Sequence, residues 1–232
     1  MIKAILFDLD GTLLDRQSSL IKFIDYQYDK FIDYLNHIDK NAFKSKFIEL
    51  DQNGYVWKDK VYAQLINIFN IIDLSADDLL DDYINNFCNQ CLPYPNLKET
   101  LDILSSKGYK LGIITNGKYP FQYDNIKALQ IEQYMDIILV SEKENIKKPN
   151  PLIFERAAKN LDLELYECLF VGDSLKNDYE ASRLAVMYSI YRLNNENNMY
   201  KVTNHIKNLY ELTEIVKNNI NLCTYSGEHV SK

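Results

Sequence analysis

The chain has 232 residues, which is long for one ordinary domain and short for two large ones, so a main domain with a modest insertion is favoured. Hydrophobic residues make up 47% and charged residues 25%, the balance of a globular protein with a core and not of a disordered chain. With 26 basic and 33 acidic residues the net charge is −7, which argues against nucleic acid or an anionic membrane as a partner.

The sequence also argues against a membrane or secreted protein. No stretch approaches the ~20 consecutive apolar residues that a membrane-spanning helix needs. The apolar N-terminal segment is interrupted by Asp8 and Asp10, so it does not resemble a signal peptide. Four cysteines in a chain of this size do not indicate a disulfide framework. We therefore expect a cytoplasmic protein, either a monomer or a homodimer.

Short apolar runs alternate with amphipathic stretches over most of the chain. The runs that we expect to form buried parallel strands span residues 2–7, 110–115, 136–141, 167–173 and, more weakly, 189–193. The amphipathic stretches that we expect to form helices span residues 97–106, 151–161, 175–185 and 206–216. This alternation predicts an α/β fold, a Rossmann-like parallel sheet with right-handed crossovers.

Residues 15–92 break the alternation. Apolar residues at helical spacing predict a long first helix from Leu20 to Ile38, a second that ends near Gly54, a third around Leu65, and a fourth that begins at a Ser75 cap. We therefore predict an all-helical domain of about 78 residues inserted into a core of residues 1–14 and 93–232. The segment Pro93-Tyr94-Pro95 is the expected return hinge, because proline resists helix and stiffens the connection.

The run Asp8-Leu9-Asp10-Gly11-Thr12 follows the first predicted strand. If strand alternation continues through it, the two carboxylates share a side, and such close acids repel each other unless a cation lies between them. Gly11 permits a sharp turn directly afterwards. A surface turn with incidental acids is the alternative for this run taken alone.

Three further polar motifs follow later strands. Thr115-Asn116-Gly117 offers a hydroxyl and backbone N–H groups for an anion, although Asn-Gly is also a common turn. Lys148 precedes a proline and can present a point charge, although a solvated lysine is the plainer interpretation. Gly172-Asp173 ends a strand, and Asp178 falls in the next helical turn, where an acid also suits the helix dipole.

Together the four motifs map to the carboxyl edge of one sheet, where open α/β folds bind ligands. In this order they match the four signature motifs of the haloacid dehalogenase (HAD) superfamily, and the sequence resembles its subfamily I phosphatases with a helical C1 cap. The resemblance covers residues 1–14 and about 93–217, and residues 15–92 are placed like the cap. It implies a Mg²⁺-dependent phosphatase that hydrolyses a small soluble phosphomonoester, of the nucleotide or sugar phosphate class, through an aspartyl-phosphate.

The resemblance also implies a role for each motif residue. Asp8 is the expected nucleophile, and Asp10 the acid that protonates the leaving alcohol and the base that then activates water. The expected magnesium ligands are the Asp8 and Asp173 carboxylates and the Asp10 backbone carbonyl, with Asp178 acting as a ligand through water. The residues expected to bind the phosphoryl group are Thr115, Asn116 through its backbone N–H, and Lys148.

Departures from related patterns separate the alternatives. The acid at position 10 favours a phosphatase or phosphomutase over a dehalogenase or an ion pump, because those proteins resemble this fold but have no acid at this position. A sugar phosphomutase is the weaker hypothesis, because the first cap helix lacks the histidine that such enzymes usually carry. A non-catalytic binding protein is weaker still, since Asp8 and Asp10 are both present. Val186 stands where relatives often have glycine, and we expect only a structural effect.

The inserted domain is expected to determine substrate specificity by closing over the phosphate. Trp57 and Lys58 lie in the loop between the second and third predicted helices, where related caps contact substrate. Trp57 could stack on a base or sugar and Lys58 could pair with an anion, with Arg16 and Tyr119 as weaker candidates. Packing of Trp57 within the cap core is an equally good interpretation.

Overall fold

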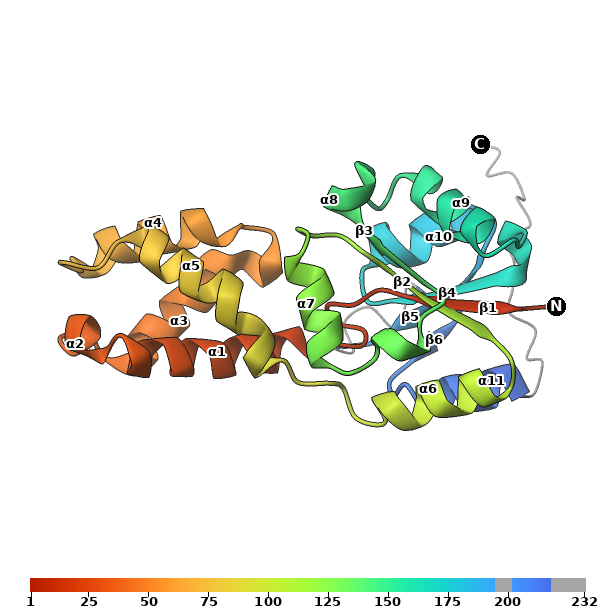
Figure 1. Cartoon of the computed structure of the whole chain (residues 1–232), viewed down its shortest axis with the longest axis horizontal. Coiled ribbons are helices and arrows are strands. Elements are labelled where there is room, and N and C mark those ends of the chain that lie inside the picture. Colours follow the sequence, from red (N-terminus) through yellow and green to blue (C-terminus); the bar gives the residue numbers. More distant parts are fainter. Residues whose placement is uncertain (195–201, 218–232) are drawn as a thin grey trace. The chain divides into compact units, whose positions relative to one another are not determined.

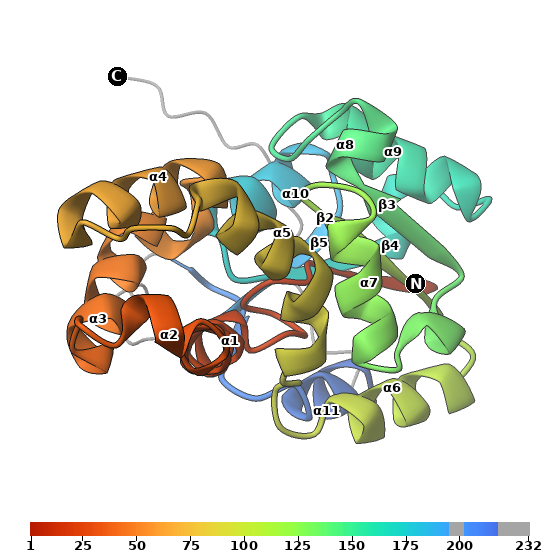
Figure 2. The ribbon, with the colours of Figure 1, turned by 60° about the vertical axis from the view of Figure 1, so that its left-hand side comes forward.

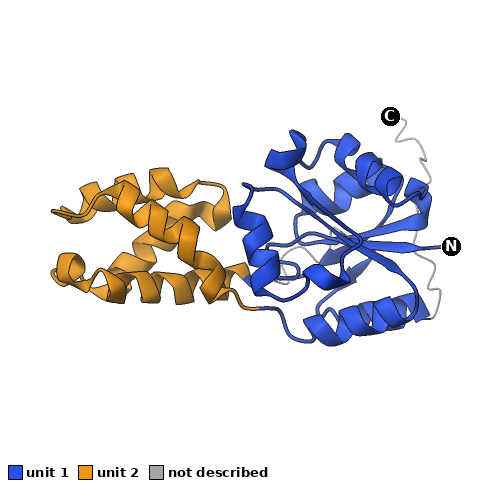
Figure 3. Cartoon of the chain, viewed as in Figure 1, with its two compact units in different colours: residues 1–15, 93–232 blue, residues 16–92 orange. Residues whose placement is uncertain are grey.

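A computed structural model describes residues 1–194 and 202–217 of the chain. Positions 195–201 and 218–232, which the sequence assigns to the core domain, lie outside the described residues. The chain divides into two compact units, residues 1–15 with 93–232 and residues 16–92, so the division falls one residue after the predicted one (Figure 3). Among the described helices, none is both long and apolar enough to cross a membrane.

The first unit contains a six-stranded parallel sheet in the order β3-β2-β1-β4-β5-β6. Its strands are β1 (Ala4–Phe7), β2 (Lys110–Thr115), β3 (Ile137–Val140), β4 (Cys168–Gly172), β5 (Tyr188–Arg192) and β6 (His205–Ile206). The first five confirm the predicted strands. The sequence pattern missed β6, and the helix expected from residue 206 begins only at Glu211.

Helices cover both faces of this sheet. The helices of the unit are α6 (Leu97–Ser106), α7 (Phe121–Ala128), α8 (Ser141–Glu144), α9 (Pro151–Asn160), α10 (Ala181–Leu184) and α11 (Glu211–Lys217). Helices α6 and α11 lie on one face, and α9 and α10 lie on the other (Figures 1 and 2). The central strand β1 is therefore fully buried, as its unbroken apolar sequence requires. Short 3₁₀ turns occur at η3 (Glu132–Tyr134) and η4 (Leu165–Glu167).

Strand order places the polar motifs together. From β1 the chain goes outward through β2 and β3, returns to β4 on the other side of β1, and continues to β5. Because all strands are parallel, the segments after β1, β2, β3 and β4 emerge at one edge, and the reversal of direction falls between β1 and β4. That edge is where a ligand crevice forms in such sheets.

The predicted helix 175–185 is two elements. A π-helical segment, η5 (Leu175–Glu180), precedes α10. Ser174 caps the first segment by accepting a hydrogen bond from the Asn177 N–H at 3.2 Å. The wider π turn begins two residues after Asp173, and such turns are frequent at functional sites.

Val186 forms a turn with a left-handed backbone conformation, at the position where the sequence analysis expected a glycine. Its φ is +65°, and hydrogen bonds from Val186 N to Arg183 O (2.9 Å) and from Met187 N to Ser182 O (3.0 Å) close α10 as a Schellman motif. A left-handed conformation costs a residue with a Cβ about 1–2 kcal/mol. Val186 thus imposes a local conformational cost at the end of a helix, which is the structural effect expected from the sequence.

The second unit is all-helical, with α1 (Arg16–Lys30), α2 (Ile32–Leu35), α3 (Lys40–Asp51), α4 (Lys58–Phe69) and α5 (Ala76–Asn86), and with 3₁₀ turns η1 (Gln52–Gly54) and η2 (Phe87–Gln90). The long first helix was a wrong prediction, because α1 ends at Lys30. The Tyr28 hydroxyl donates to the carbonyls of Leu35 (3.2 Å) and Ile38 (2.5 Å), which folds the following segment back while keeping both apolar side chains buried. The predicted Ser75 cap is confirmed as a capping box with Asp78.

A buried polar residue joins three of these helices. Gln27 of α1 donates through Nε2 to the Leu79 carbonyl at 2.9 Å and to Asp82 at 3.0 Å, and accepts a hydrogen bond from the Tyr62 hydroxyl at 2.8 Å. The side-chain amide of Gln27 thus donates to α5 and accepts from α4. Such a satisfied buried network fixes how the helices pack.

Candidate active site

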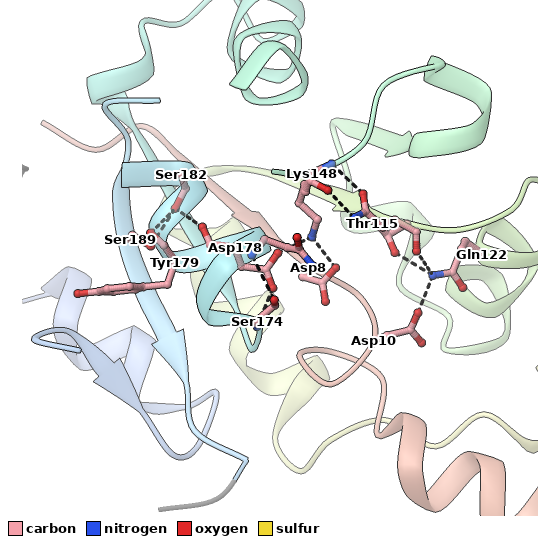
Figure 4. A network of polar contacts seen from close by, with 12 residues as sticks. Asp8, Asp10, Thr115, Gln122, Lys148, Ser174, Asp178, Tyr179, Ser182 and Ser189 are labelled. Atoms are coloured by element: carbon pink, nitrogen blue, oxygen red, sulfur yellow. Dashed lines mark hydrogen bonds and ion pairs between the residues drawn. The ribbon is translucent and has the colours of Figure 1, made fainter. Parts of the chain in front are cut away.

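The first acid, Asp8, lies one residue beyond β1 in a buried ionic cluster. Its Oδ1 accepts a hydrogen bond from Lys148 Nζ at 2.7 Å, and the same ammonium donates to Asp178 Oδ1 at 2.7 Å (Figure 4). The Lys148 and Asp178 side chains are each only 2% exposed. Residues from three separate motifs therefore meet at one cation.

Asp173 completes the acidic side of this cluster. Carboxylate oxygens of Asp8, Asp173 and Asp178 all lie within 4.8 Å of one another. Three carboxylates against the single ammonium of Lys148 leave an excess of negative charge in a buried place. A divalent cation with a preference for carboxylate oxygen, such as Mg²⁺, fits this set of ligands.

The pKa values of these acids show the same imbalance. Burial, followed by repulsion from Asp178 and Asp173, raises the pKa of Asp8 well above its usual range despite the attraction of Lys148. Burial and then repulsion from Asp178 raise the pKa of Asp173 to about 7. Burial lowers the pKa of Lys148, but Asp178 and Asp8 together outweigh it and the net shift is upward, so the lysine stays charged.

Asp178 is already engaged by the protein through both carboxylate oxygens. Oδ1 accepts from Lys148, and Oδ2 accepts from the Ser174 backbone N–H at 2.9 Å. Gly172 makes room for it, because a Cβ there would come within 2.5 Å of the Asp178 side chain. This arrangement suits contact with a metal through water better than direct ligation.

Asp10 points to different partners from Asp8. Strand β1 ends at Phe7, so the alternation expected to place both acids on one side does not extend to them. The Asp10 Oδ2 accepts a hydrogen bond from Gln122 Nε2 at 2.6 Å, on the side of the second motif (Figure 4). Two acids that are two residues apart thus have separate surroundings, one beside an ammonium and one beside a neutral amide.

Gly11 is required at the turn after Asp10. Its φ is +79°, and a Cβ would come within 2.1 Å of Asp173 Oδ2. The sequence analysis predicted the turn but not the close approach of Asp173.

Asn116 positions Lys148 through its side chain. Its Nδ2 donates to the Lys148 carbonyl at 2.9 Å, and its Oδ1 accepts from the Lys148 backbone N–H, also at 2.9 Å. This paired contact joins the loop after β2 to the loop after β3. Thr115, at the end of β2, is only 1% exposed and accepts a hydrogen bond from Gln122 at 2.8 Å.

Three residues at this edge were not found from the sequence. Asn194 donates to Asp173 Oδ2 at 2.8 Å and to the Gly11 carbonyl at 3.1 Å, and Arg192 donates to the same carbonyl at 2.8 Å. Arg192 is the last residue of β5, and Asn194 lies two residues beyond it. Gln122 lies on α7, a helix that the sequence analysis did not predict; its proximity to Thr115-Asn116-Gly117 was the available signal.

The cap residues form a cluster of their own. Asp51 is 2% exposed and accepts hydrogen bonds from Arg16 at 2.9 Å to each carboxylate oxygen, from the Gly54 N–H at 2.8 Å, and from Lys58. The Lys58 ammonium also lies 5.2 Å from the centre of the Tyr83 ring, against which Trp57 packs edge-on. Lys58 is thus buried with a carboxylate, and Trp57 is partly buried against an aromatic neighbour.

Comparison with known proteins identifies the family. The model of haloacid dehalogenase-like hydrolases matches residues 5–192. The chain belongs to this family. It is 29% identical over 195 residues to a glyceraldehyde 3-phosphate phosphatase of Pyrococcus abyssi, covering 82% of this chain and 81% of the relative.

Two further relatives agree with this assignment. A phosphoglycolate phosphatase of Aliivibrio fischeri is 31% identical over 195 residues, covering 81% of this chain and 82% of that protein. The crystal structure of a HAD phosphatase from Thermococcus onnurineus superposes with a TM-score of 0.67 at 30% identity, covering 93% of this chain and 98% of the other. The protein is accordingly a hydrolase with the HAD fold, as the sequence motifs predict.

Proposed function

We propose that this protein is a phosphatase that uses Mg²⁺ and hydrolyses a small phosphomonoester through an aspartyl-phosphate on Asp8. The observation that carries the proposal is the different placement of the two acids of the first motif. Asp8 lies with Lys148 in the acidic cluster, whereas Asp10 is held by the Gln122 amide. The two acids therefore have different surroundings, as two carboxyl groups with different roles in a two-step mechanism require.

In the first half-reaction an Asp8 carboxylate oxygen attacks phosphorus, and the bond from phosphorus to the substrate alcohol oxygen breaks. Asp10 gives its proton to that oxygen, so the product leaves as a neutral alcohol. In the second, Asp10 takes a proton from water as the water oxygen attacks phosphorus. The bond to Asp8 then breaks, which releases inorganic phosphate and restores both acids.

The other residues of the site have supporting roles in this proposal. Lys148 offsets negative charge on Asp8 and on the phosphoryl group, and Thr115 with the Asn116 N–H binds phosphoryl oxygens. A Mg²⁺ ion bound by Asp8, Asp173, the Asp10 carbonyl and, through water, Asp178 would lower the raised pKa values of the acids and offset charge on the phosphoryl group.

The substrate is proposed to be a short phosphorylated metabolite in the cytoplasm. The names of the relatives from Pyrococcus abyssi and Aliivibrio fischeri support the phosphates of short sugars and acids over nucleotides within the class expected from the sequence. In the cap, we propose that Trp57 and Lys58 contact the part of the substrate beyond the phosphoryl group. Arg16 and Lys58 place two cationic groups in this region, and cationic groups attract an anionic substrate.

Replacing the nucleophile tests the proposal. Asp8→Asn should reduce turnover by at least about 10³-fold on every phosphomonoester in a panel, because the amide is not a nucleophile toward phosphorus. Free phosphate is measured with Mg²⁺ and after metal removal by a chelator, which should also abolish turnover reversibly. Asp77→Asn, which removes an exposed acid of the cap, is the matched control and should keep wild-type activity.

Either of two results would contradict the proposal. An Asp8→Asn variant with wild-type phosphatase activity excludes Asp8 as nucleophile. An isomerised sugar phosphate formed without release of phosphate identifies a mutase instead. Circular dichroism of each variant separates loss of activity from loss of fold.

A further inference from the structure

Gln122 occupies a position between the two halves of the catalytic edge. It is the second residue of α7 and only 2% exposed. Its Nε2 lies 2.6 Å from Asp10 Oδ2, 2.8 Å from Thr115 Oγ1 and 3.4 Å from the Asn116 carbonyl (Figure 4). One neutral side chain thus contacts both the proposed proton-transfer acid and the proposed phosphoryl-binding hydroxyl.

The chemistry of these neighbours determines the orientation of the amide. A carboxylate and a carbonyl only accept hydrogen bonds, so the NH₂ end of Gln122 must face them. The Oε1 end accepts a hydrogen bond from Asn125 Nδ2 at 3.3 Å, which agrees with this assignment. The two amide protons match the two short contacts, to Asp10 and to Thr115.

This orientation has a consequence for Thr115. Its hydroxyl accepts from Gln122, so the proton of that hydroxyl remains for donation to another acceptor. A phosphoryl oxygen is such an acceptor. The same amide restrains the Asp10 carboxylate in rotation, which matters because proton transfer needs the acid within hydrogen-bond reach of the leaving oxygen.

The backbone beside Gln122 is shaped to admit it. A Cβ at Gly117 would come within 2.6 Å of Gln122 Cγ, so any larger residue at position 117 would displace this side chain. The Gln122 N–H donates to the Lys118 carbonyl at 3.0 Å, which fixes the first turn of α7. The glycine of the second motif is therefore matched to a residue five positions later.

We propose that Gln122 is a positioning residue that orients Asp10 for protonation of the leaving group and polarises Thr115 toward the phosphoryl group. This inference rests on the proposed phosphatase function and adds a residue that acts through Asp10. It differs from simple packing in one measurable respect. Loss of an oriented acid harms substrates whose leaving group needs a proton and largely spares those whose leaving group departs as a stable anion.

The test compares two substrates in each of two variants of Gln122. Gln122→Met keeps the length of the side chain and removes its donors, and Gln122→Glu keeps its shape and replaces the donor with an acceptor. For each, kcat/KM is measured on propyl phosphate, whose alkoxide leaves poorly, and on 4-nitrophenyl phosphate, whose phenolate leaves well. This ratio reports steps up to departure of the alcohol, so slow hydrolysis of the intermediate does not obscure it.

We expect kcat/KM on propyl phosphate to fall about 100-fold in both variants, the size typical of a displaced acid, and on 4-nitrophenyl phosphate by less than about tenfold. Gln133→Leu, at an exposed position of the same unit, should change neither. If Gln122→Met does not fold, Gln122→Glu decides the outcome, with circular dichroism as the check.

The possible results separate the two proposals. Equal losses on both substrates overturn the orientation of Asp10 by Gln122, and no loss on either overturns both of its roles, while the wild-type activity keeps the phosphatase proposal intact. A wild-type protein that releases phosphate from neither these substrates nor the metabolite panel overturns both.

Discussion

The two units of the molecule each bury a cluster of charged side chains, and the two clusters combine acids and bases in different numbers. In the core, Asp8, Asp173 and Asp178 lie close together, and the Lys148 ammonium pairs with two of them, Asp8 and Asp178. In the cap, one carboxylate, Asp51, is shared by two cations. Buried ions are costly unless groups of opposite charge compensate them, so an excess of one charge favours binding of an ion of the other charge.

The two clusters differ in how protein groups compensate their charges. Asp51 accepts hydrogen bonds at both oxygens from within its own unit, so its charge is compensated there. In the core, burial and repulsion between the acids raise the pKa values of Asp8 and Asp173 despite the attraction of Lys148. The core cluster could therefore hold a metal ion, whereas Asp51 in the cap is compensated by protein groups.

The largest expected effect is on the pH dependence of core stability. The pKa values of Asp8 and Asp173 are raised above the value of about 4 that acids have in an unfolded chain. Between about pH 4 and 7 the folded metal-free protein therefore holds more protons than the unfolded one, and the free energy of unfolding should fall as pH rises. Added Mg²⁺ should restore stability, more at pH 7.5 than at pH 5, because it binds the ionised acids of the folded state.

Urea unfolding at the two pH values, with a chelator and with excess Mg²⁺, measures this effect. In the presence of chelator, Asp173→Asn should flatten much of the slope, since it removes one of the two shifted groups. A metal-free protein that becomes more stable between pH 5 and 7.5, or one whose unfolding is insensitive to Mg²⁺, would show that the core acids are compensated without a cation.

A smaller effect is expected from breaking the cap cluster. Lys58→Met should lower the free energy of unfolding by about 2 kcal/mol, below the usual 3–5 kcal/mol for breaking a buried ion pair, because Arg16 still compensates Asp51. Lys60→Met, at an exposed position of the same helix, is the control and should stay within about 0.5 kcal/mol. Equal stabilities of the two variants would mean that Lys58 contributes no net stability at Asp51.

The sequence predicted the core more completely than the cap, for a physical reason. Buried parallel strands are unbroken apolar runs, so β1, β2 and β4 stand out, and the motif residues follow them directly. The two-residue strand β6 is too short to produce a pattern. Helix α7 was missed because its buried positions include the polar residues Gln122 and Asn125, so it lacks an apolar face.

Pairings between polar residues far apart in the chain could not be predicted from the sequence. Lys58 was predicted to face an anionic substrate, but its carboxylate partner in the structure lies seven positions earlier, across a 3₁₀ turn with no regular spacing. Gln122 and Asp10 are 112 positions apart. A motif shows which groups carry the chemistry, whereas the groups that orient them are selected by the folded chain.

The smallest expected effect concerns Trp57, and it distinguishes a substrate-contacting cap from a merely structural one. Trp57 packs edge-on against Tyr83 at 6.2 Å and is only partly buried, so both roles remain open to its indole. If it contacts substrate, Trp57→Ala should change the ranking of phosphorylated metabolites by about tenfold in kcat/KM, the value of a lost apolar contact, and leave 4-nitrophenyl phosphate nearly unaffected. Tyr34→Ala, a half-exposed aromatic position of α2, should leave the ranking unchanged. Equal losses on the metabolites and on the aryl phosphate would instead assign Trp57 to the cap core with Tyr83.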